Sequence, residues 1–255
     1  MTDLRFGVVG VGRLGSAHAR ILGEMPGVEL VGVHDSDQAR ARTVAETVGT
    51  SHFEQSDDLF SCTDAVIVAV TTSAHHLMAK AALESGCHVL VEKPLTPSLE
   101  EADELVDLAE ARGLFLGVGH VERFNPAIRA CRPYLNDPRF LACQRLATFQ
   151  PRGTDVPVML DLMIHDIDLV LGLVESEVES VHAIGVPLLT DSVDMANARI
   201  VFRNGAVADI SASRASAERT RQLRLFQPSG YFSLDLATGQ GEFLRRREGV
   251  DAAAL

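Results

Sequence analysis

Short apolar runs alternate with amphipathic segments over the first half of the chain. Some runs are apolar at every position, which is typical of strands covered by helices on both faces of a parallel sheet. The pattern therefore predicts an α/β domain with a parallel sheet over residues 1–120. The predicted strands are Arg5–Val9, Glu29–His34, Ala65–Ala69, Val89–Val91 and Phe115–Val118. The predicted helices are Leu14–Glu24, Ser36–Val48, Ala74–Glu84 and Leu99–Ala111.

The pattern changes after His120, where helical segments are embedded among alternating strands. This predicts a second, α+β domain over residues 121–255, with a mostly antiparallel open sheet. Arg203-Asn204-Gly205 predicts a hairpin with a type I′ turn, because asparagine and glycine both tolerate positive φ. The predicted helices are Pro126–Leu135 and Met159–Val174. The predicted strands are Phe140–Phe149, Val178–Val186, Ala196–Phe202, Ala206–Ala212, Gln222–Phe226 and Phe232–Asp235.

A glycine motif, Gly10-Val11-Gly12-Arg13-Leu14-Gly15, follows the first predicted strand and opens the first helix. Its glycines allow a tight turn, close approach to a pyrophosphate, and close packing of helix on strand. Asp35 ends the second strand, 20 residues after Gly15, where an acid binds ribose hydroxyls. An ordinary turn and a helix-capping Asp35 are the alternative. The combination favours a Rossmann domain that binds NAD rather than NADP, because a carboxylate repels a 2′-phosphate.

Lys93 lies in the turn Glu92-Lys93-Pro94, directly after an apolar strand. Ligands of parallel sheets bind at the carboxyl ends of strands, so we expect Lys93 near the nicotinamide. Of 23 basic residues only Lys80 and Lys93 are lysine, and 21 are arginine. A lysine kept against this bias suits a role that needs a titratable ammonium. A surface lysine paired with Glu92 is the alternative, but the position favours a catalytic Lys93 that holds a substrate oxygen.

Asp161 and His165 share one face of the predicted helix Met159–Val174 with Asp168 and Gly172, at about 100° per residue. The rest of this helix is apolar nearly all round, which predicts that it is buried. Its polar stripe is either structural, with a capping Asp161 and a hydrogen-bonded His165, or a proton-transfer pair beside the substrate. The cofactor motif favours the catalytic pair. No further ligand stands at metal-site spacing, so no metal is predicted.

Softer candidates lie in two other places. A polar turn that contains Thr71, Thr72 and His75 follows the third strand. Either His75 or His76 can reach the cofactor from this turn; the alternative is that the turn only caps a helix. The residues predicted to bind the cofactor are Gly10, Gly12, Arg13, Leu14, Gly15, Asp35, Thr71, Thr72, His75, Glu92 and Lys93. The residues predicted to bind the substrate are Arg123, Asn125, Arg152 and His165, with the arginine forks suited to an anionic group.

Over nearly its whole length the sequence resembles the glucose–fructose oxidoreductase/inositol dehydrogenase (Gfo/Idh/MocA) family. The resemblance rests on the glycine motif, Asp35, the Glu92-Lys93-Pro94 turn and the Asp161-x3-His165 helix. It implies that Lys93, Asp161 and His165 surround a reacting CH–OH carbon, with NAD as hydride acceptor. Thr71 stands where proline is common, and family members usually continue further at the C-terminus.

Within the family, the strings around Arg123, Arg152 and His165 resemble those of enzymes that oxidise the C3 hydroxyl of UDP-N-acetylglucosamine to a ketone. Three alternatives stay open. One is another sugar or inositol dehydrogenase of the family, and the second is a catalytically silent NAD-binding sensor or partner subunit. The third is reductase chemistry on a different ligand, such as an imine or a tetrapyrrole, because the fold alone does not fix the substrate. The open sheet of the second half needs its second face buried, which predicts a homodimer or homotetramer.

Composition then narrows the partners. The net charge of −12 argues against nucleic acid. No apolar run approaches the roughly 18–20 residues of a membrane span, and the N-terminal residues lack the pattern of a signal peptide. The four cysteines are spread out without a CxxC pair, which predicts buried thiols in a reducing compartment. We therefore expect a cytoplasmic enzyme with a small-molecule substrate and neither nucleic acid nor membrane as partner.

Overall fold

The computed structural model describes residues 3–150 and 156–246. The chain divides into two compact units between Gly119 and His120. No helix in the described part of the chain is long and apolar enough to cross a membrane.

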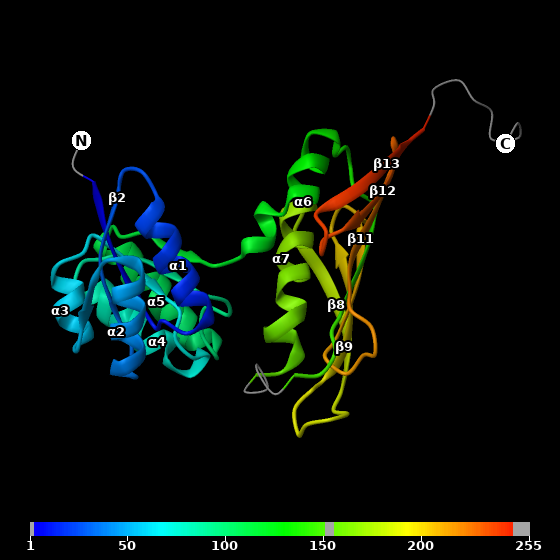
Figure 1. Cartoon of the computed structure of the whole chain (residues 1–255). Coiled ribbons are helices and arrows are strands. Elements are labelled where there is room, and N and C mark those ends of the chain that lie inside the picture. Colours follow the sequence, from blue (N-terminus) through cyan, green and yellow to red (C-terminus); the bar gives the residue numbers. More distant parts are fainter. Residues whose placement is uncertain (1–2, 151–155, 247–255) are drawn as a thin grey trace, which may run out of the picture. The chain divides into compact units, whose positions relative to one another are not determined.

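The first unit is built on a six-stranded sheet in the order β3-β2-β1-β4-β5-β6, with every neighbouring pair parallel. Its strands are β1 (Leu4–Val9), β2 (Val28–His34), β3 (Ser51–Phe53), β4 (Ala65–Val68), β5 (His88–Val91) and β6 (Leu116–Val118). Its helices are α1 (Arg13–Glu24), α2 (Gln38–Val48), α3 (Ser56–Ser61), α4 (Thr72–Glu84) and α5 (Leu99–Arg112). The predicted parallel α/β domain is therefore confirmed (Figure 1).

Helices cover both faces of this sheet. One apolar cluster joins α1 and α2 to the sheet, and a second joins α3, α4 and α5 to it. The short elements β3 and α3 were not predicted, because three and six residues carry too little periodicity. The strand order reverses between β1 and β4, so the carboxyl ends of these two strands flank the crevice where ligands of such sheets bind.

The second unit holds a seven-stranded sheet in the order β13-β12-β11-β7-β10-β9-β8. Its strands are β7 (Phe140–Leu146), β8 (Val178–Val186), β9 (Met195–Phe202), β10 (Val207–Ser213), β11 (Thr220–Gln227), β12 (Gly230–Asp235) and β13 (Gln240–Arg245). Its helical elements are the 3₁₀ turns η1 (Val121–Phe124) and η2 (Arg132–Tyr134), α6 (Pro126–Cys131), the π-helical turn η3 (Met159–Met163) and α7 (Ile164–Leu173). The predicted mostly antiparallel sheet is confirmed, with β7 and β10 as its parallel pair.

Helices α6 and α7 lie on one face of this sheet (Figure 1). The buried face carries small and aliphatic side chains, and every second residue of β9 and β10 contributes to the core. On the opposite face, where the described chain places no helix, the strand registers align six apolar side chains into a row. This apolar row runs through Leu244, Tyr231, Phe226, Phe140, Val207 and Val201.

Two local predictions for the second unit need correction, and one strand was missed. The turn at 203–205 is not type I′, because Gly205 has φ +81° but Asn204 has no positive φ. This agrees instead with a three-residue loop that ends in a left-handed glycine. The predicted helix Met159–Val174 begins as a π turn over Met159–Met163, so the α-helical angle per residue does not hold there. Strand β13 was not predicted.

The cysteines agree only in part with the expectation of buried thiols. Cys87, Cys131 and Cys143 are buried, whereas Cys62 is half-buried, and all four are free thiols. Burial raises the pKa of the Cys131 thiol to about 11, which keeps it protonated at neutral pH.

Three charged side chains are buried between the sheet and the helices of the second unit. Arg145 on β7 forms a bidentate pair with Asp166 of α7, with both N–O distances 2.9 Å, and also contacts Glu122 of η1 at 3.1 Å. Arg145 and Asp166 are 3% and 1% exposed. Burial raises the pKa of the Asp166 carboxyl, and the guanidinium offsets part of this shift. The cluster ties strand, helix and 3₁₀ turn together, so its members are mutually dependent.

Asp194 organises the loop between β8 and β9. One carboxylate oxygen accepts the backbone N–H groups of Leu188, Leu189 and Thr190 at 2.9, 2.6 and 2.8 Å, and the other accepts the Thr190 hydroxyl. Burial opposes ionisation, but these donors outweigh it and hold the pKa of Asp194 well below its ordinary value.

We predict that Asp194→Asn lowers the thermal midpoint at pH 7 and that this difference shrinks in acid. A carboxyl with a depressed folded-state pKa stabilises the fold above its unfolded pKa, about 3.9, and loses that contribution as pH falls toward its folded pKa. Thermal unfolding of both proteins between pH 7 and pH 3 measures the difference. A gap that stays constant across this range contradicts the prediction.

Candidate active site

The turn between β1 and α1 is too tight for any side chain but hydrogen. Gly10 has φ +82°, and a Cβ on it would lie 2.7 Å from the carbonyl oxygen of Ala69. A Cβ on Gly15 would lie 1.8 Å from the carbonyl oxygen of Gly10. Helix α1 therefore packs directly onto the turn that precedes it, and only glycine permits this approach.

The N-terminus of α1 fits a pyrophosphate. Gly12 is its N-cap, no side chain caps it, and no acidic residue lies in the first turn. A Cβ on Gly12 would meet only an Arg40 nitrogen, at 4.0 Å, so the backbone there is open to a ligand. Exposed N–H groups and the positive end of the helix dipole favour an anion at this point. Arg13 and Leu14, the first helical residues, are both exposed.

Asp35 follows β2 and lies against the same turn. Its carboxylate accepts the N–H of Val11 at 2.8 Å and that of Asp37 at 2.9 Å. The cap of α2 is Asp37, whose side chain accepts the N–H of Arg40, so Asp35 is not the helix cap. The glycine turn and Asp35 are thus held in register by one hydrogen bond, as an adenosine ribose site requires.

Arg40 is a residue that the sequence analysis did not single out. Its guanidinium pairs with Asp37 at 2.9 Å and lies 3.8 Å from Asp35. The hydrogen bond that Arg40 donates to Asp37, together with the charge of Asp35, raises the pKa of Arg40. The sequence could have indicated this residue, because an arginine stands in the first turn of the helix that follows Asp35. Arg40 places a positive charge beside the carboxylate that is expected to face the ribose.

Lys93 is half-buried in the turn after β5, at the carboxyl end of the sheet. The Lys93–Pro94 peptide is cis. Glu92 continues the strand through a backbone hydrogen bond to Val68, and its carboxylate lies 2.7 Å from the His18 ring of α1. Glu92 is therefore paired with His18, which the sequence analysis did not consider.

The polar turn at 71–75 leads into α4. Thr71 is the N-cap without a side-chain cap bond, and Thr72 is the first helical residue. The His75 ring is 2% exposed and contacts the carbonyl oxygens of Pro94 and Val70. His76 points elsewhere, because its ring lies 2.7 Å from Glu104 of α5. Of the two histidines, only His75 is joined to the Lys93 turn.

In the second unit, Asp161 lies in the π turn η3, and His165 lies two residues after the end of that turn, as the second residue of α7. Both are half-buried. π turns occur frequently at functional sites because they re-aim the side chains they carry. Asp166 and Asp168 are buried instead, each paired with an arginine.

The predicted substrate residues have structural partners. Arg123 donates two hydrogen bonds to Asp168, at 2.7 and 2.5 Å, and this pairing raises the pKa of Arg123. Asn125 caps α6 and donates to Glu122 and the carbonyl oxygen of Leu236. A substrate contact by either residue must use a remaining donor or exchange one of these bonds. Arg152 lies outside the described residues.

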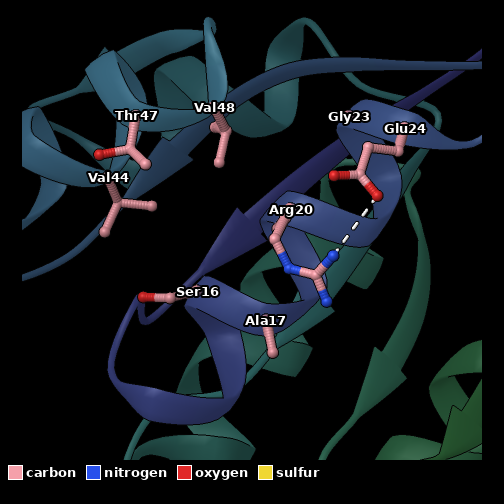
Figure 2. A pocket seen from close by; sticks show the side chains of 8 residues that line it. All are labelled: Ser16, Ala17, Arg20, Gly23, Glu24, Val44, Thr47 and Val48. Carbon is pink, nitrogen blue, oxygen red and sulfur yellow. Dashed lines mark hydrogen bonds and ion pairs between the residues drawn. The ribbon is translucent and has the colours of Figure 1, made fainter.

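A groove of about 540 Å³ lies between α1 and α2 (Figure 2). It is lined by Ser16, Ala17, Arg20, Gly23, Glu24, Val44, Thr47 and Val48. None of these is a predicted site residue, and Arg20 and Glu24 pair with each other across one helical turn. Among the described residues, no group of three or more His, Cys, Asp or Glu side chains is arranged to hold a metal ion.

Two family models match the chain. Residues 4–120 match the oxidoreductase family with an NAD-binding Rossmann fold, and residues 133–232 match the GFO/IDH/MocA C-terminal domain. The chain belongs to the Gfo/Idh/MocA family. It is therefore an NAD-binding oxidoreductase, and the open α1 N-terminus with Asp35 behind it fits that cofactor.

Named members of the Gfo/Idh/MocA family are similar to the chain over most of its length. A UDP-N-acetylglucosamine 3-dehydrogenase from Acidithiobacillus ferrooxidans is 40% identical over 98% of this chain and 80% of its own. Its solved structure matches with a TM-score of 0.92, over 96% of this chain and 81% of that one. A scyllo-inositol 2-dehydrogenase (NAD(+)) from Bacillus subtilis is 32% identical over 84% of this chain and 68% of its own.

We predict that Asp35→Ala weakens NADH binding by about 10- to 100-fold in this Gfo/Idh/MocA protein, because ribose hydroxyls lose a charged hydrogen-bond acceptor. The ratio of NADPH to NADH affinity should rise, since Arg40 is left beside the ribose without the opposing carboxylate. Fluorescence titration with both nucleotides measures the ratio. The second variant Asp35→Ala/Arg40→Ala should abolish the gain, and an unchanged ratio in Asp35→Ala would refute the role of Arg40.

Proposed function

We propose that the chain is an NAD-dependent dehydrogenase that oxidises the C3 hydroxyl of a UDP-N-acetylhexosamine such as UDP-N-acetylglucosamine to a ketone. The observation that carries this proposal is the 40% identity, over 98% of the chain, to a dehydrogenase named for that substrate and position. The site supports it in two ways. The glycine turn Gly10–Gly15 leaves the start of α1 open to a dinucleotide (we call this turn the dinucleotide cradle), and Lys93 lies in the turn after β5, the strand that pairs with β4.

Each catalytic side chain has one task in this proposal. The Lys93 ammonium binds the oxygen of the reacting hydroxyl and stabilises the negative charge that develops there. His165 accepts the hydroxyl proton, and Asp161, four residues before it in the π turn, orients the ring. Bound NAD supplies the hydride acceptor. Arg123 and Arg152 are the proposed partners of the diphosphate, which a guanidinium fork can bind.

A substrate screen tests the activity. The chain is incubated with NAD and UDP-N-acetylglucosamine, free N-acetylglucosamine, myo-inositol or scyllo-inositol, and NADH formation is followed at 340 nm. We expect the sugar nucleotide to be oxidised most efficiently. Oxidation of inositol alone would assign the chain to the chemistry named for its Bacillus relative. NAD binding without oxidation of any of these compounds would favour a silent sensor or partner subunit.

We predict that Lys93→Met lowers kcat by about 100-fold or more while the Kd for NADH changes less than about twofold, because methionine cannot stabilise the developing charge. Lys80→Met is the matched control, since Lys80 is the other lysine and pairs with Glu104 on the surface of α4 and α5. Steady-state rates and NADH titration of both variants give the result. Full activity of Lys93→Met would remove Lys93 from the reaction.

We also propose that the chain forms a homodimer or homotetramer through the open face of the second sheet. The apolar row crosses six strands there, and Phe226 in its centre is 42% exposed and contacts the rings of Phe140 and Tyr231. Neighbouring positions along the strands are polar, among them the Arg199–Asp209 pair. A self-complementary surface of this kind suits a two-fold contact between copies.

The free cysteines support the cytoplasm as the compartment.

We predict that Phe226→Asp shifts the protein to monomers, because a carboxylate in the middle of the apolar row has no partner once the face is covered. Size-exclusion chromatography with light scattering measures the mass. Leu99→Asp, at the exposed start of α5, is the control and should leave the mass unchanged. A monomeric parent protein at micromolar concentration excludes the proposed assembly.

A further inference from the structure

The His75 imidazole is buried between the two turns that end β4 and β5. Its Nδ1 lies 2.7 Å from the carbonyl oxygen of Pro94 and its Nε2 lies 3.2 Å from that of Val70. The ring is 2% exposed. Because β4 and β5 are parallel neighbours, the ring spans the carboxyl ends of adjacent strands. It leaves the first turn of α4 toward the residue that follows Lys93.

Both contacts of the ring are to hydrogen-bond acceptors, so the imidazole acts as a donor. We place an N–H on Nδ1, because its contact with Pro94 is the shorter of the two and the carbonyl of Pro94 can only accept. Pro94 has no N–H of its own to fix the turn. The imidazole therefore supplies the turn after Lys93 with a hydrogen bond from outside the turn.

The residue before Lys93 is held in a similar way. The carboxylate of Glu92 is 15% exposed and lies 2.7 Å from Nε2 of His18. A Cβ on Gly119 would lie 3.0 Å from the same carboxylate, so the backbone of Gly119 limits its movement. Helix α1 thus contacts one flank of Lys93, and helix α4 contacts the other.

We propose that His75 is a positioning residue for Lys93: its Nδ1–H holds the carbonyl of Pro94 and thereby sets the direction in which the Lys93 side chain leaves the turn. This inference rests on the proposed role of Lys93 in catalysis. A lysine side chain has four rotatable bonds, so its backbone must be fixed for the ammonium to meet one substrate oxygen. A misplacement of about 1 Å costs roughly 100-fold in rate.

Three substitutions separate positioning from simple packing. Asparagine places an amide N–H at the same number of bonds from Cα as Nδ1, so His75→Asn can still donate to Pro94. His75→Gln places its amide one bond further out, toward Val70, and His75→Phe fills the space without a donor. The matched controls are His76→Asn, His76→Gln and His76→Phe on the next residue, which faces Glu104 instead.

We expect His75→Phe and His75→Gln to lower kcat by about 10- to 100-fold, while His75→Asn stays within about fivefold of the parent. The buried ring faces two protein carbonyl oxygens, so we expect no direct contact with the cofactor and a change of less than about twofold in the Kd for NADH in all three variants. The His76 variants should keep the parent kcat. In a Lys93→Met background, His75→Gln should have no further effect on the residual rate, because the group that it positions is gone. The ratio of kcat between His75→Asn and His75→Gln is informative even if His75→Phe does not fold.

Each other outcome rejects the proposal. Equal kcat values for His75→Asn, His75→Gln and the parent would remove the positioning role. Equal losses of kcat, NADH affinity and thermal midpoint in all three variants would reduce His75 to a packing residue. Lys93→Met, measured beside them, keeps the two proposals apart: full activity of Lys93→Met overturns the proposed function and with it the positioning role. An inactive Lys93→Met together with a fully active His75→Gln overturns only the positioning role of His75.

Discussion

The first unit depends on a close backbone contact between Gly15 and the carbonyl oxygen of Gly10. A Cβ on Gly15 would lie 1.8 Å from this oxygen, so only glycine fits there. This contact brings the start of α1 directly over the end of β1, at the point where the strand order reverses. The open backbone at Gly12 and the hydrogen bond from Val11 to Asp35 lie in the same turn. The close packing of this helix on this turn is therefore what permits a backbone approach to a pyrophosphate at Gly12.

The same helix also reaches the turn that carries Lys93. His18 lies three residues after Gly15, on a neighbouring face of α1, and pairs with Glu92. A shift of α1 away from β1 would therefore disturb both the dinucleotide cradle and the flank of Lys93. Helix α1 thus contributes both to the packing around the glycine turn and to the contact with Glu92, so a substitution at Gly15 would affect the cofactor site and the Lys93 turn together. This is why effects on NADH affinity and on kcat need to be measured separately when a site residue is tested.

Local patterns could be predicted from the sequence, and partners far apart in the chain could not. The glycine motif, Asp35 and the lysine turn follow strand-to-helix patterns within a few residues. The buried cluster of Glu122, Arg145 and Asp166 joins residues 21 to 23 positions apart, from a 3₁₀ turn, a strand and a helix. No periodicity connects such segments before the fold brings them together. The π turn at Asp161 was missed for a similar reason, because it changes the angle between side chains without changing their spacing in sequence.

The scarcity of lysine in the sequence is a weaker indication of a catalytic role for Lys93 than the position of Lys93 after a parallel strand. Arginine forms the fixed pairs of the second unit, with Arg145 on Asp166 and Arg123 on Asp168, where a planar fork binds a carboxylate bidentately. Yet the other lysine, Lys80, pairs with Glu104 on an exposed helix surface, in a place where arginine would serve equally well. Retention against an arginine bias therefore does not by itself indicate chemistry. What distinguishes Lys93 is its place after the carboxyl end of β5, an inner parallel strand, with an imidazole bonded to the residue on each side of it.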